Sequence, residues 1–264
     1  MSTTKNKLKQ SFPYRFLRKL EQDLRKAAKK FSMLYRLKKA PPVFIYQMGK
    51  VASSSIHHSL KKQYPGPVAH AHHIGSDNWA SELFYKWYRQ GYTIKIISPI
   101  RDPIGYNISS FFQNFEKITG APFSNSKYET KELIQLFLEK SDHDAPLHWF
   151  DNNLKKHFDI DVFGSDFPDD GYKIYRHNNI ELLVFQISIS DTDKENIIRE
   201  FLGISKFTLH NRNISSKKSY HQDYHDFKQR LKLPDDYLLK MKNSRFFSHF
   251  YSAQEIDKIL LKWK

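Results

Sequence analysis

The chain has 264 residues, a formal net charge of +15 at neutral pH, and 39% hydrophobic residues, of which many are aromatic. This length and apolar content suffice for the core of one ordinary domain. The absence of cysteine excludes a disulfide framework and a zinc–thiolate site, and it suits a reducing compartment. No apolar run approaches the ~18 residues of a membrane span, and no signal-peptide core is evident.

The positive charge is concentrated at the N-terminus. Residues 1–39 hold 13 Lys and Arg against two acidic residues, which leaves only +4 for the rest of the chain. Apolar residues recur there at steps of three and four, at Leu17, Leu20, Leu24, Ala27, Phe31 and Leu34. This pattern predicts a basic amphipathic helix, which is typical of a segment on an anionic membrane surface, of a polyanion-binding arm, or of a helix packed on the domain. We therefore predict a basic arm, residues 1–40, and an α/β domain, residues 41–264.

A predicted strand, loop and helix follow the arm. The apolar run 43–46 comes after a Pro-Pro pair and is typical of a buried strand. The loop then reads Gly49, Lys50, Val51, Ala52, Ser53, Ser54 and Ser55, and apolar residues at helical spacing follow. Backbone N–H groups at a helix N-terminus, a lysine and serine hydroxyls together favour phosphate binding.

Other phosphate-binding patterns fit this loop poorly. The nucleotide-triphosphate P-loop requires a glycine where Phe44 stands and a hydroxyl residue where Val51 stands. The dinucleotide pattern requires three glycines, and Gly49 is alone. A serine-rich helix cap beside a solvated lysine is the structural alternative.

The next predicted strand carries a group of histidines, His70, His72 and His73. In a strand, His70 and His72 share one side and His73 faces the other. With a pKa near neutrality, histidine suits a general base that removes a proton from a hydroxyl. An ordinary buried or surface histidine is the alternative for each of the three.

A second strand–loop–helix unit lies at residues 93–112. Its β-branched run ends at Arg101-Asp-Pro, and Pro103 suits the first turn of a helix. Ser109 lies eight residues after Arg101. A guanidinium binds phosphate through paired, charge-assisted hydrogen bonds, so this unit predicts a second phosphate site.

The two units together resemble those of the sulfotransferases that use 3′-phosphoadenosine 5′-phosphosulfate (PAPS). The resemblance covers residues 43–115 well, and within the superfamily it is closest to bacterial polysaccharide-type enzymes, including those of capsular polysaccharide synthesis. It implies that Lys50 and the serines bind the 5′-phosphosulfate and that Arg101 and Ser109 hold the 3′-phosphate. It further implies His72, and after it His70, as the general base. Val51 departs from the family, many members of which carry a hydroxyl there.

The remaining chain is predicted to be mostly helical. Helices are indicated near 78–90, 130–140, 144–158, 191–203, 221–232 and 234–243, and a two-stranded hairpin at 172–187. The resemblance implies that a late basic loop with Lys217 and Lys218 folds over the nucleotide, although a solvated loop fits the sequence as well. Ser252 and Glu255 have the spacing of a capping box.

We therefore expect a single α/β domain with a central parallel sheet flanked by helices, in a P-loop-like sulfotransferase fold. The resemblance implies transfer of a sulfuryl group from PAPS to a hydroxyl of a carbohydrate, polysaccharide or glycolipid, with adenosine 3′,5′-bisphosphate as product and no metal. The expected partners are this nucleotide, a saccharide acceptor and an anionic membrane surface, rather than nucleic acid. The expected location is the cytoplasm, including the inner face of a membrane. A nucleotide kinase or NTPase, and a non-enzymatic nucleic-acid or membrane binder, remain the alternatives.

Overall fold

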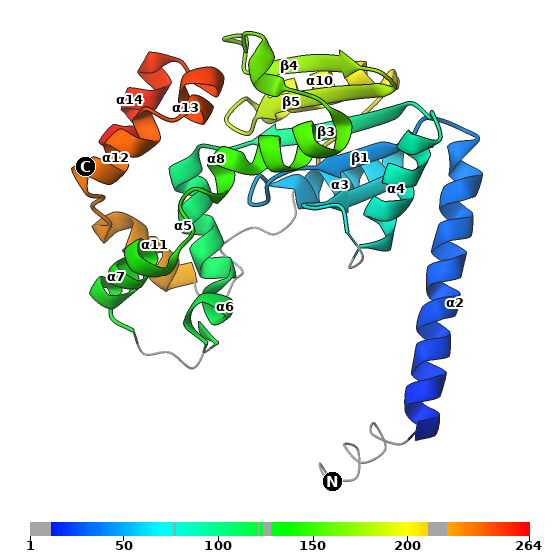
Figure 1. The fold of residues 1–264 in the computed structure, drawn as a ribbon, viewed down its shortest axis with the longest axis horizontal. Helices are drawn as coiled ribbons and strands as arrows, with labels where there is room; N and C mark the ends of the chain where they lie inside the picture. Colours follow the sequence, from blue (N-terminus) through cyan, green and yellow to red (C-terminus); the bar gives the residue numbers. More distant parts are fainter. Residues whose placement is uncertain (1–11, 76–77, 121, 124–127, 211–220) are drawn as a thin grey trace.

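The computed structural model describes residues 12–75, 78–120, 122–123, 128–210 and 221–264. Within these residues, five strands form one sheet in the order β2-β1-β3-β5-β4 (Figure 1). The strands are β1 (Val43–Tyr46), β2 (Val68–Ala71), β3 (Ile94–Ile100), β4 (Tyr172–His177) and β5 (Ile180–Gln186). All neighbouring pairs are parallel except β4 with β5. The predicted α/β class with a mostly parallel central sheet is confirmed, and the predicted hairpin forms one edge of that sheet.

Helices connect the strands and make up most of the C-terminal half. They are α2 (Phe12–Leu37), α3 (Ser53–Gln63), α4 (Trp79–Arg89), α5 (Pro103–Gln113), α6 (Phe115–Thr119), α7 (Thr130–Lys140), α8 (Ala145–Phe150), α10 (Asp191–Leu202), α11 (His221–Arg230), α12 (Asp235–Lys242), α13 (Arg245–Phe250) and α14 (Ala253–Leu261). The helix predicted at 144–158 is instead α8, a π-helical turn η2 (Asp151–Lys155) and the short α9 (Lys156–Phe158), followed by a 3-10 turn η3 (Val162–Gly164). The predicted capping box of α14 is present, because Ser252 and Glu255 bond each other's backbone N–H groups.

The inner strands β1, β3 and β5 are buried on both faces of the sheet. The side chains of β1 alternate between two cores, with Val43 and Ile45 on one side and Phe44 and Tyr46 on the other, all fully buried. Helices α3 and α10 cover the first face, and α4, α5, α8 and the C-terminal helices cover the second (Figure 1). Burial on both faces explains why these strands read as apolar runs rather than as alternating patterns.

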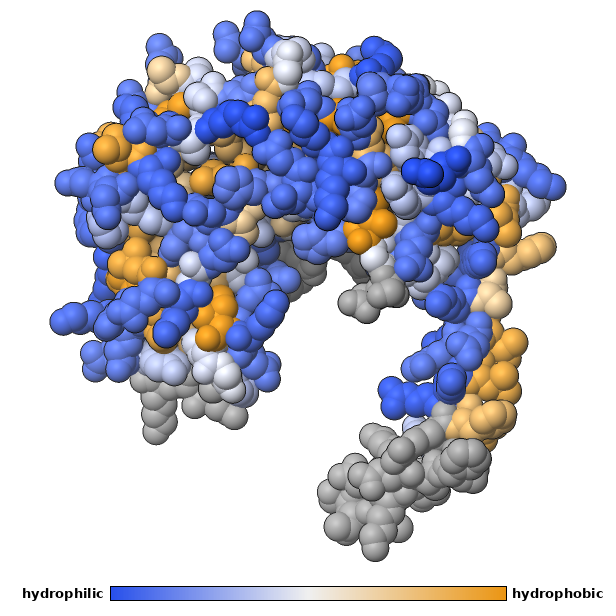
Figure 2. Space-filling view, in the orientation of Figure 1, coloured by the Kyte–Doolittle hydropathy of each residue, from blue (hydrophilic) through white to orange (hydrophobic). Residues whose placement is uncertain are grey.

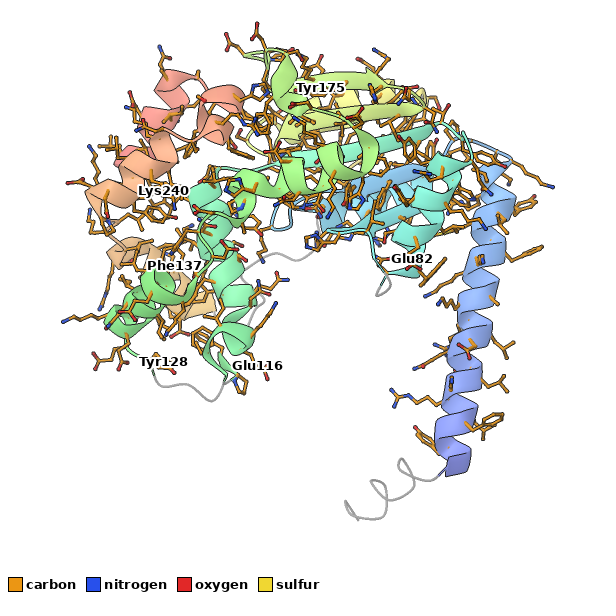
Figure 3. All side chains as sticks on the ribbon, in the orientation of Figure 1. Glu82, Glu116, Tyr128, Phe137, Tyr175 and Lys240 are labelled. Atoms are coloured by element: carbon orange, nitrogen blue, oxygen red, sulfur yellow. The ribbon has the colours of Figure 1, made fainter. Side chains whose placement is uncertain are left out.

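An aromatic cluster fastens the C-terminal helices to α5. Phe137 of α7, Phe111 of α5 and Phe227 of α11 contact one another, and the Phe137 ring centroid lies 5.6 Å from each of the other two. Figure 3 shows Phe137 pointing into this group of helices. All three rings are buried, and rings in such tilted arrangements contribute ~0.5–1.5 kcal/mol per pair beyond their burial. This packing brings α11, which is remote in sequence, next to α5.

Helix α2 projects away from the rest of the molecule (Figure 1). Its last turn is held at the end of α3, where the Arg36 guanidinium donates to the carbonyls of Tyr64 and, at 3.1 Å, of Pro65. Tyr64 in turn donates its hydroxyl to the Pro41 carbonyl at 2.7 Å. The attachment therefore lies at the amino end of β1.

Candidate active site

The strand order places two loops next to each other at one edge of the sheet. From β1 the chain crosses to β2 on one side, and β3 then pairs with the other side of β1. In open parallel sheets, such a reversal opens a crevice at the carboxyl ends of the strands, where ligands bind. The loops after β1 and β3 carry Lys50 and Arg101, and Arg101 Nη1 lies 3.4 Å from the Lys50 carbonyl oxygen.

A cavity of about 660 Å³ occupies this position. It is lined by Met48, Gly49, Lys50, Ala52, Ser53, Ser54, His70, His72, His73, Arg101, Tyr106, Ser109, Ser110, Phe112, Gln113, Asn114, Ile187, Tyr224 and Lys228. A pocket of this size accommodates a nucleotide-sized ligand. Its lining combines lysine, arginine, serine and histidine side chains, which suits an anionic ligand more than an apolar one.

The loop between β1 and α3 has an unusual backbone. Gly49, Lys50 and Ala52 all have positive φ values, of 95°, 58° and 56°. This conformation costs a non-glycine residue ~1–2 kcal/mol, so the surrounding structure must hold it. Left-handed residues just before a helix aim backbone N–H groups into a common concavity, and α3 begins immediately afterwards, at Ser53. The loop thus has the form of an anion-binding site.

Cationic side chains gather around this loop. Lys50 Nζ donates to Gln113 Oε1 of α5, and the Arg101 guanidinium lies 3.9 Å from Asp102. Lys228 of α11 lines the same cavity, and burial followed by the charge of Arg101 lowers the pKa of its ammonium group. A bound anion stabilises the protonated form of such neighbouring cations, because its negative charge offsets their mutual repulsion.

The histidines belong to a network centred on Gln47, which is fully buried. Gly49 N–H donates to Gln47 Oε1, which fixes the orientation of the amide. Gln47 Nε2 then lies 2.8 Å from Ser53 Oγ, 3.0 Å from His70 Nε2 and 3.0 Å from His72 Nδ1. Because an amide nitrogen only donates, the bond to His70 forms when His70 Nε2 is unprotonated. Ser53 Oγ, at 2.9 Å, is a second partner of that nitrogen.

His72 has a different environment from His70. Its Nδ1 also lies 3.1 Å from the Gln47 carbonyl oxygen, so this nitrogen has both a donor and an acceptor as neighbours. Trp149 of α8 donates to the His72 carbonyl at 3.1 Å and thereby holds the backbone. A Cβ added at Gly49 would stand 3.8 Å from the His72 ring, so the ring lies directly beside the lysine loop.

Burial keeps these histidines neutral. It lowers the pKa of His70 to about 4, assisted by His72 and His57, and it lowers the pKa of His57 to about 4, assisted by Lys61 and His58. The pKa of His72 is also lowered, again mainly by burial. A neutral imidazole can accept a proton, so the site contains bases that are ready at neutral pH.

The same shifts predict an acid-labile fold. Above the unfolded-state pKa of about 6.5, His57 and His70 are neutral in both the folded and the unfolded protein. Between pH 6.5 and about 4 they are protonated in the unfolded protein but stay neutral in the folded one, so the free energy of unfolding decreases as the pH falls through this range. Each group contributes at most ~1.4 kcal/mol per pH unit, less for the solvent-exposed part of each ring. Urea unfolding between pH 7 and 5.5 should show this loss, and His57→Asn should reduce it. An unchanged pH slope in His57→Asn would contradict the assignment.

Most predicted site residues converge on the cavity. Gly49, Lys50, Ala52, Ser53, Ser54, His70, His72, Arg101 and Ser109 all line it. Val51 and Ser55 are buried and are not among the lining residues. The Ser53 hydroxyl takes part in the Gln47 network, so the half-buried Ser54 is the serine of the loop best placed to meet a ligand. Lys217 and Lys218 lie outside the described residues.

Sequence reasoning missed several contributors. Gln113 follows Ser109 by one helical turn on α5, and this spacing could have identified it. Tyr224 and Lys228 carry no such signal, because their positions depend on the packing of α11 against α5. Gln47 directly follows β1, but its histidine partners lie 23 and 25 residues away.

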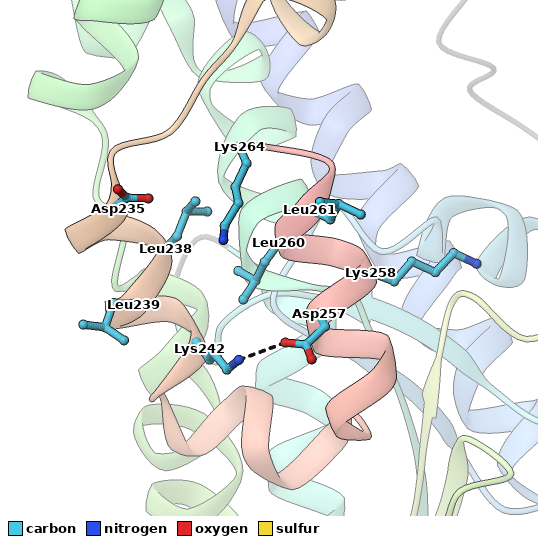
Figure 4. Close-up of a pocket in the computed structure, with 9 residues that line it drawn as sticks. All are labelled: Asp235, Leu238, Leu239, Lys242, Asp257, Lys258, Leu260, Leu261 and Lys264. Atoms are coloured by element: carbon cyan, nitrogen blue, oxygen red, sulfur yellow. Dashed lines mark hydrogen bonds and ion pairs between the residues drawn. The ribbon is translucent and has the colours of Figure 1, made fainter.

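A second cavity, of about 440 Å³, lies between α12 and α14 (Figure 4). Leucines form much of its wall, and the Lys242–Asp257 ion pair, at 2.8 Å, closes one side. It lacks the histidines and serine hydroxyls of the first cavity among its lining residues. The first cavity is therefore the candidate active site.

The protein is therefore of the α/β class, with a pocket lined by cationic side chains at the carboxyl ends of its parallel strands. A family model described as "NKWYS: Putative capsular polysaccharide synthesis protein" matches residues 126–252, slightly less than half of the chain. The match spans α7 to α13 and includes Tyr224 and Lys228 of the cavity, whereas Lys50, the histidines and Arg101 precede it. No curated protein and no solved structure matched the chain. The similarity relates the chain to proteins of glycan synthesis.

Proposed function

We propose that this protein is a PAPS-dependent sulfotransferase that moves a sulfuryl group to a hydroxyl of a carbohydrate, polysaccharide or glycolipid. The observation that carries the proposal is the convergence of Lys50, Arg101, Ser109 and His72, from three separate segments of the chain, on one cavity. The similarity to a capsular polysaccharide synthesis family supports a saccharide as acceptor. The P-loop-like character of the fold belongs to this proposal, and the strained anion-type loop after β1 supports it.

The donor groups of the cavity fit such a nucleotide. A bisphosphorylated nucleotide with a sulfate carries several negative charges at two separate positions. The cavity offers cations from two loops, Lys50 after β1 and Arg101 after β3, and a third, Lys228, from α11. A guanidinium binds phosphate in a bidentate manner, which suits Arg101 to the 3′-phosphate. Ser109, on the helix α5 that follows Arg101, supplies a hydroxyl to the same group.

The residues of the site divide the work between leaving group and acceptor. PAPS, when bound, supplies the activated sulfuryl group, whose bond to the 5′-phosphate breaks as the acceptor oxygen attacks. Lys50 stabilises the charge that develops on the departing phosphate, and Ser54 and the loop N–H groups orient it. In the tautomer that carries its proton on Nδ1, His72 donates to the Gln47 carbonyl oxygen, and Nε2 then accepts the acceptor's proton.

Nucleotide selectivity tests the proposal without an acceptor. Adenosine 3′,5′-bisphosphate should raise the melting temperature more than AMP at equal concentration, because Arg101 and Ser109 recognise the 3′-phosphate. A ligand at about 100 times its Kd adds ~2.7 kcal/mol, or roughly 5–10 °C for a chain of this size. The measurement is a thermal shift titration with adenosine 3′,5′-bisphosphate, AMP, ATP and NAD.

Arg101→Gln provides the control for this titration. It should bring the shift by adenosine 3′,5′-bisphosphate down to the AMP level, measured against the variant's own unliganded melting temperature. Equal shifts by the two nucleotides in the unmodified protein would remove the 3′-phosphate site. A larger shift by ATP would favour a kinase or NTPase instead.

A further inference from the structure

Helix α2 presents an apolar stripe to solvent. In the described structure the large apolar side chains along one side of the helix are 43–74% exposed: Phe16, Leu17, Leu20, Leu24, Phe31, Leu34 and Tyr35. These residues recur at three- and four-residue steps and so lie along a single side of the helix. Exposing this much contiguous apolar surface is unfavourable in water, which indicates that the stripe has a partner.

The stripe faces away from the domain. Among the described residues of α2, Met33 and Leu37 are partly buried against the core, and Arg36 hydrogen-bonds the domain. At 3.6 residues per turn, these positions lie on the side of the helix opposite to Leu24 and Phe31. Figure 2 shows the hydrophobic surface of α2 on its outer side and hydrophilic surface on the side toward the molecule. The domain itself therefore does not cover the stripe.

Positive charge lies on the side of α2 opposite to the stripe. Within residues 12–37 the sequence has eight Lys and Arg and two acidic residues, a net charge of +6 for the helix. The basic residues include Arg18, Lys19, Arg25, Lys26, Lys29 and Lys30. None of the described helices is long and apolar enough to cross a membrane.

We propose that α2 docks in the plane of an anionic lipid bilayer. The apolar stripe enters the boundary between headgroups and acyl chains, and the long lysine and arginine side chains on the opposite, polar side extend to the lipid phosphates. Charge complementarity selects this partner over a second copy of the chain, because pairing two such helices would bring +6 against +6. The attachment lies at the amino end of β1 and the candidate active site at the carboxyl end, so docking concerns location and is separate from the proposed chemistry.

Vesicle binding by the full chain tests the proposal. The probes are phosphatidylcholine vesicles with and without one-third phosphatidylglycerol, and the readout is co-sedimentation. The stripe variant is Leu17→Glu with Leu24→Glu, both 62% exposed. The matched control is Leu239→Glu with Leu261→Glu, which are 57% and 73% exposed on α12 and α14 and add the same charge.

The stripe variant should bind the anionic vesicles about 100-fold more weakly, because it loses two leucine side chains that enter the bilayer in the proposed complex. The control should bind like the unmodified protein. Binding to pure phosphatidylcholine should be at least ~10-fold weaker than to the anionic vesicles. Equal losses in both variants, or full binding by the stripe variant, would overturn the proposal. So would a lipid-free dimer that the stripe substitutions abolish, because the stripe would then belong to a second copy. The nucleotide titration tests the proposed sulfotransferase function independently of vesicle binding, so either proposal can be contradicted without the other.

Discussion

Replacing Lys50 by alanine should lower sulfuryl transfer by two or more orders of magnitude. Losing one contact that stabilises developing charge costs ~3–4 kcal/mol in a water-excluded site. Lys50 lines the cavity beside Arg101 and is oriented by Gln113, so its loss should also weaken adenosine 3′,5′-bisphosphate binding. The measurement is transfer of a labelled sulfuryl group from PAPS to each of a panel of saccharides, with nucleotide affinity determined in parallel.

The backbone of Lys50 offers a sharper variant. Its φ of 58° is strained for any residue with a Cβ and unstrained for glycine. Lys50→Gly should therefore keep the melting temperature near that of the unmodified protein, since relief of strain offsets the greater freedom of the unfolded chain. Its turnover should fall as far as that of Lys50→Ala. A glycine variant with near-native turnover would mean that the lysine charge does not act on the leaving group.

Replacing His72 by alanine should lower turnover by roughly 10²–10⁴, the usual contribution of a general base. Binding of adenosine 3′,5′-bisphosphate should change little, because the base acts on the acceptor rather than on the nucleotide. Burial lowers the pKa of His72, so the acid limb of the pH–rate profile should lie below 6.5 in the unmodified protein. That limb should disappear in His72→Ala.

His70→Ala is the matched control for this experiment. His70 Nε2 is already occupied by Gln47 and Ser53, so its loss should disturb the position of these side chains and leave the acid limb in place. An inactive His70→Ala combined with a near-native His72→Ala would reverse the assignment of the base. Near-native rates in both variants would place the base elsewhere.

Much of the fold was predictable from local sequence. The apolar run of β1, the histidine-bearing β2 and the β-branched run of β3 each precede a polar loop and a helix, and this repetition predicts a parallel sheet. Caps such as Asn78 before α4 and the Ser252–Glu255 box of α14 mark helix ends through contacts within four residues. The helix predicted at 144–158 is interrupted in the structure by the π-helical turn η2. Asn153 of this turn accepts a hydrogen bond from the Tyr46 hydroxyl, a contact between residues far apart in the sequence that no local pattern indicates.

The sequence by itself predicted Lys50, Arg101, Ser109 and the histidines as candidate site residues. The first three follow predicted strands at short spacings and the histidines cluster within four residues, and such patterns are local. The tertiary structure decided how these residues meet. It placed β3 beside β1, which brings Arg101 to the Lys50 loop, and it brought His70 and His72 within hydrogen-bond distance of Gln47, the residue that follows β1. The aromatic contact of α11 with α5 brought Lys228 to the same cavity. These pairings join residues 23 to well over 100 positions apart, and no periodicity along the chain encodes contacts that depend on strand order and side-chain packing.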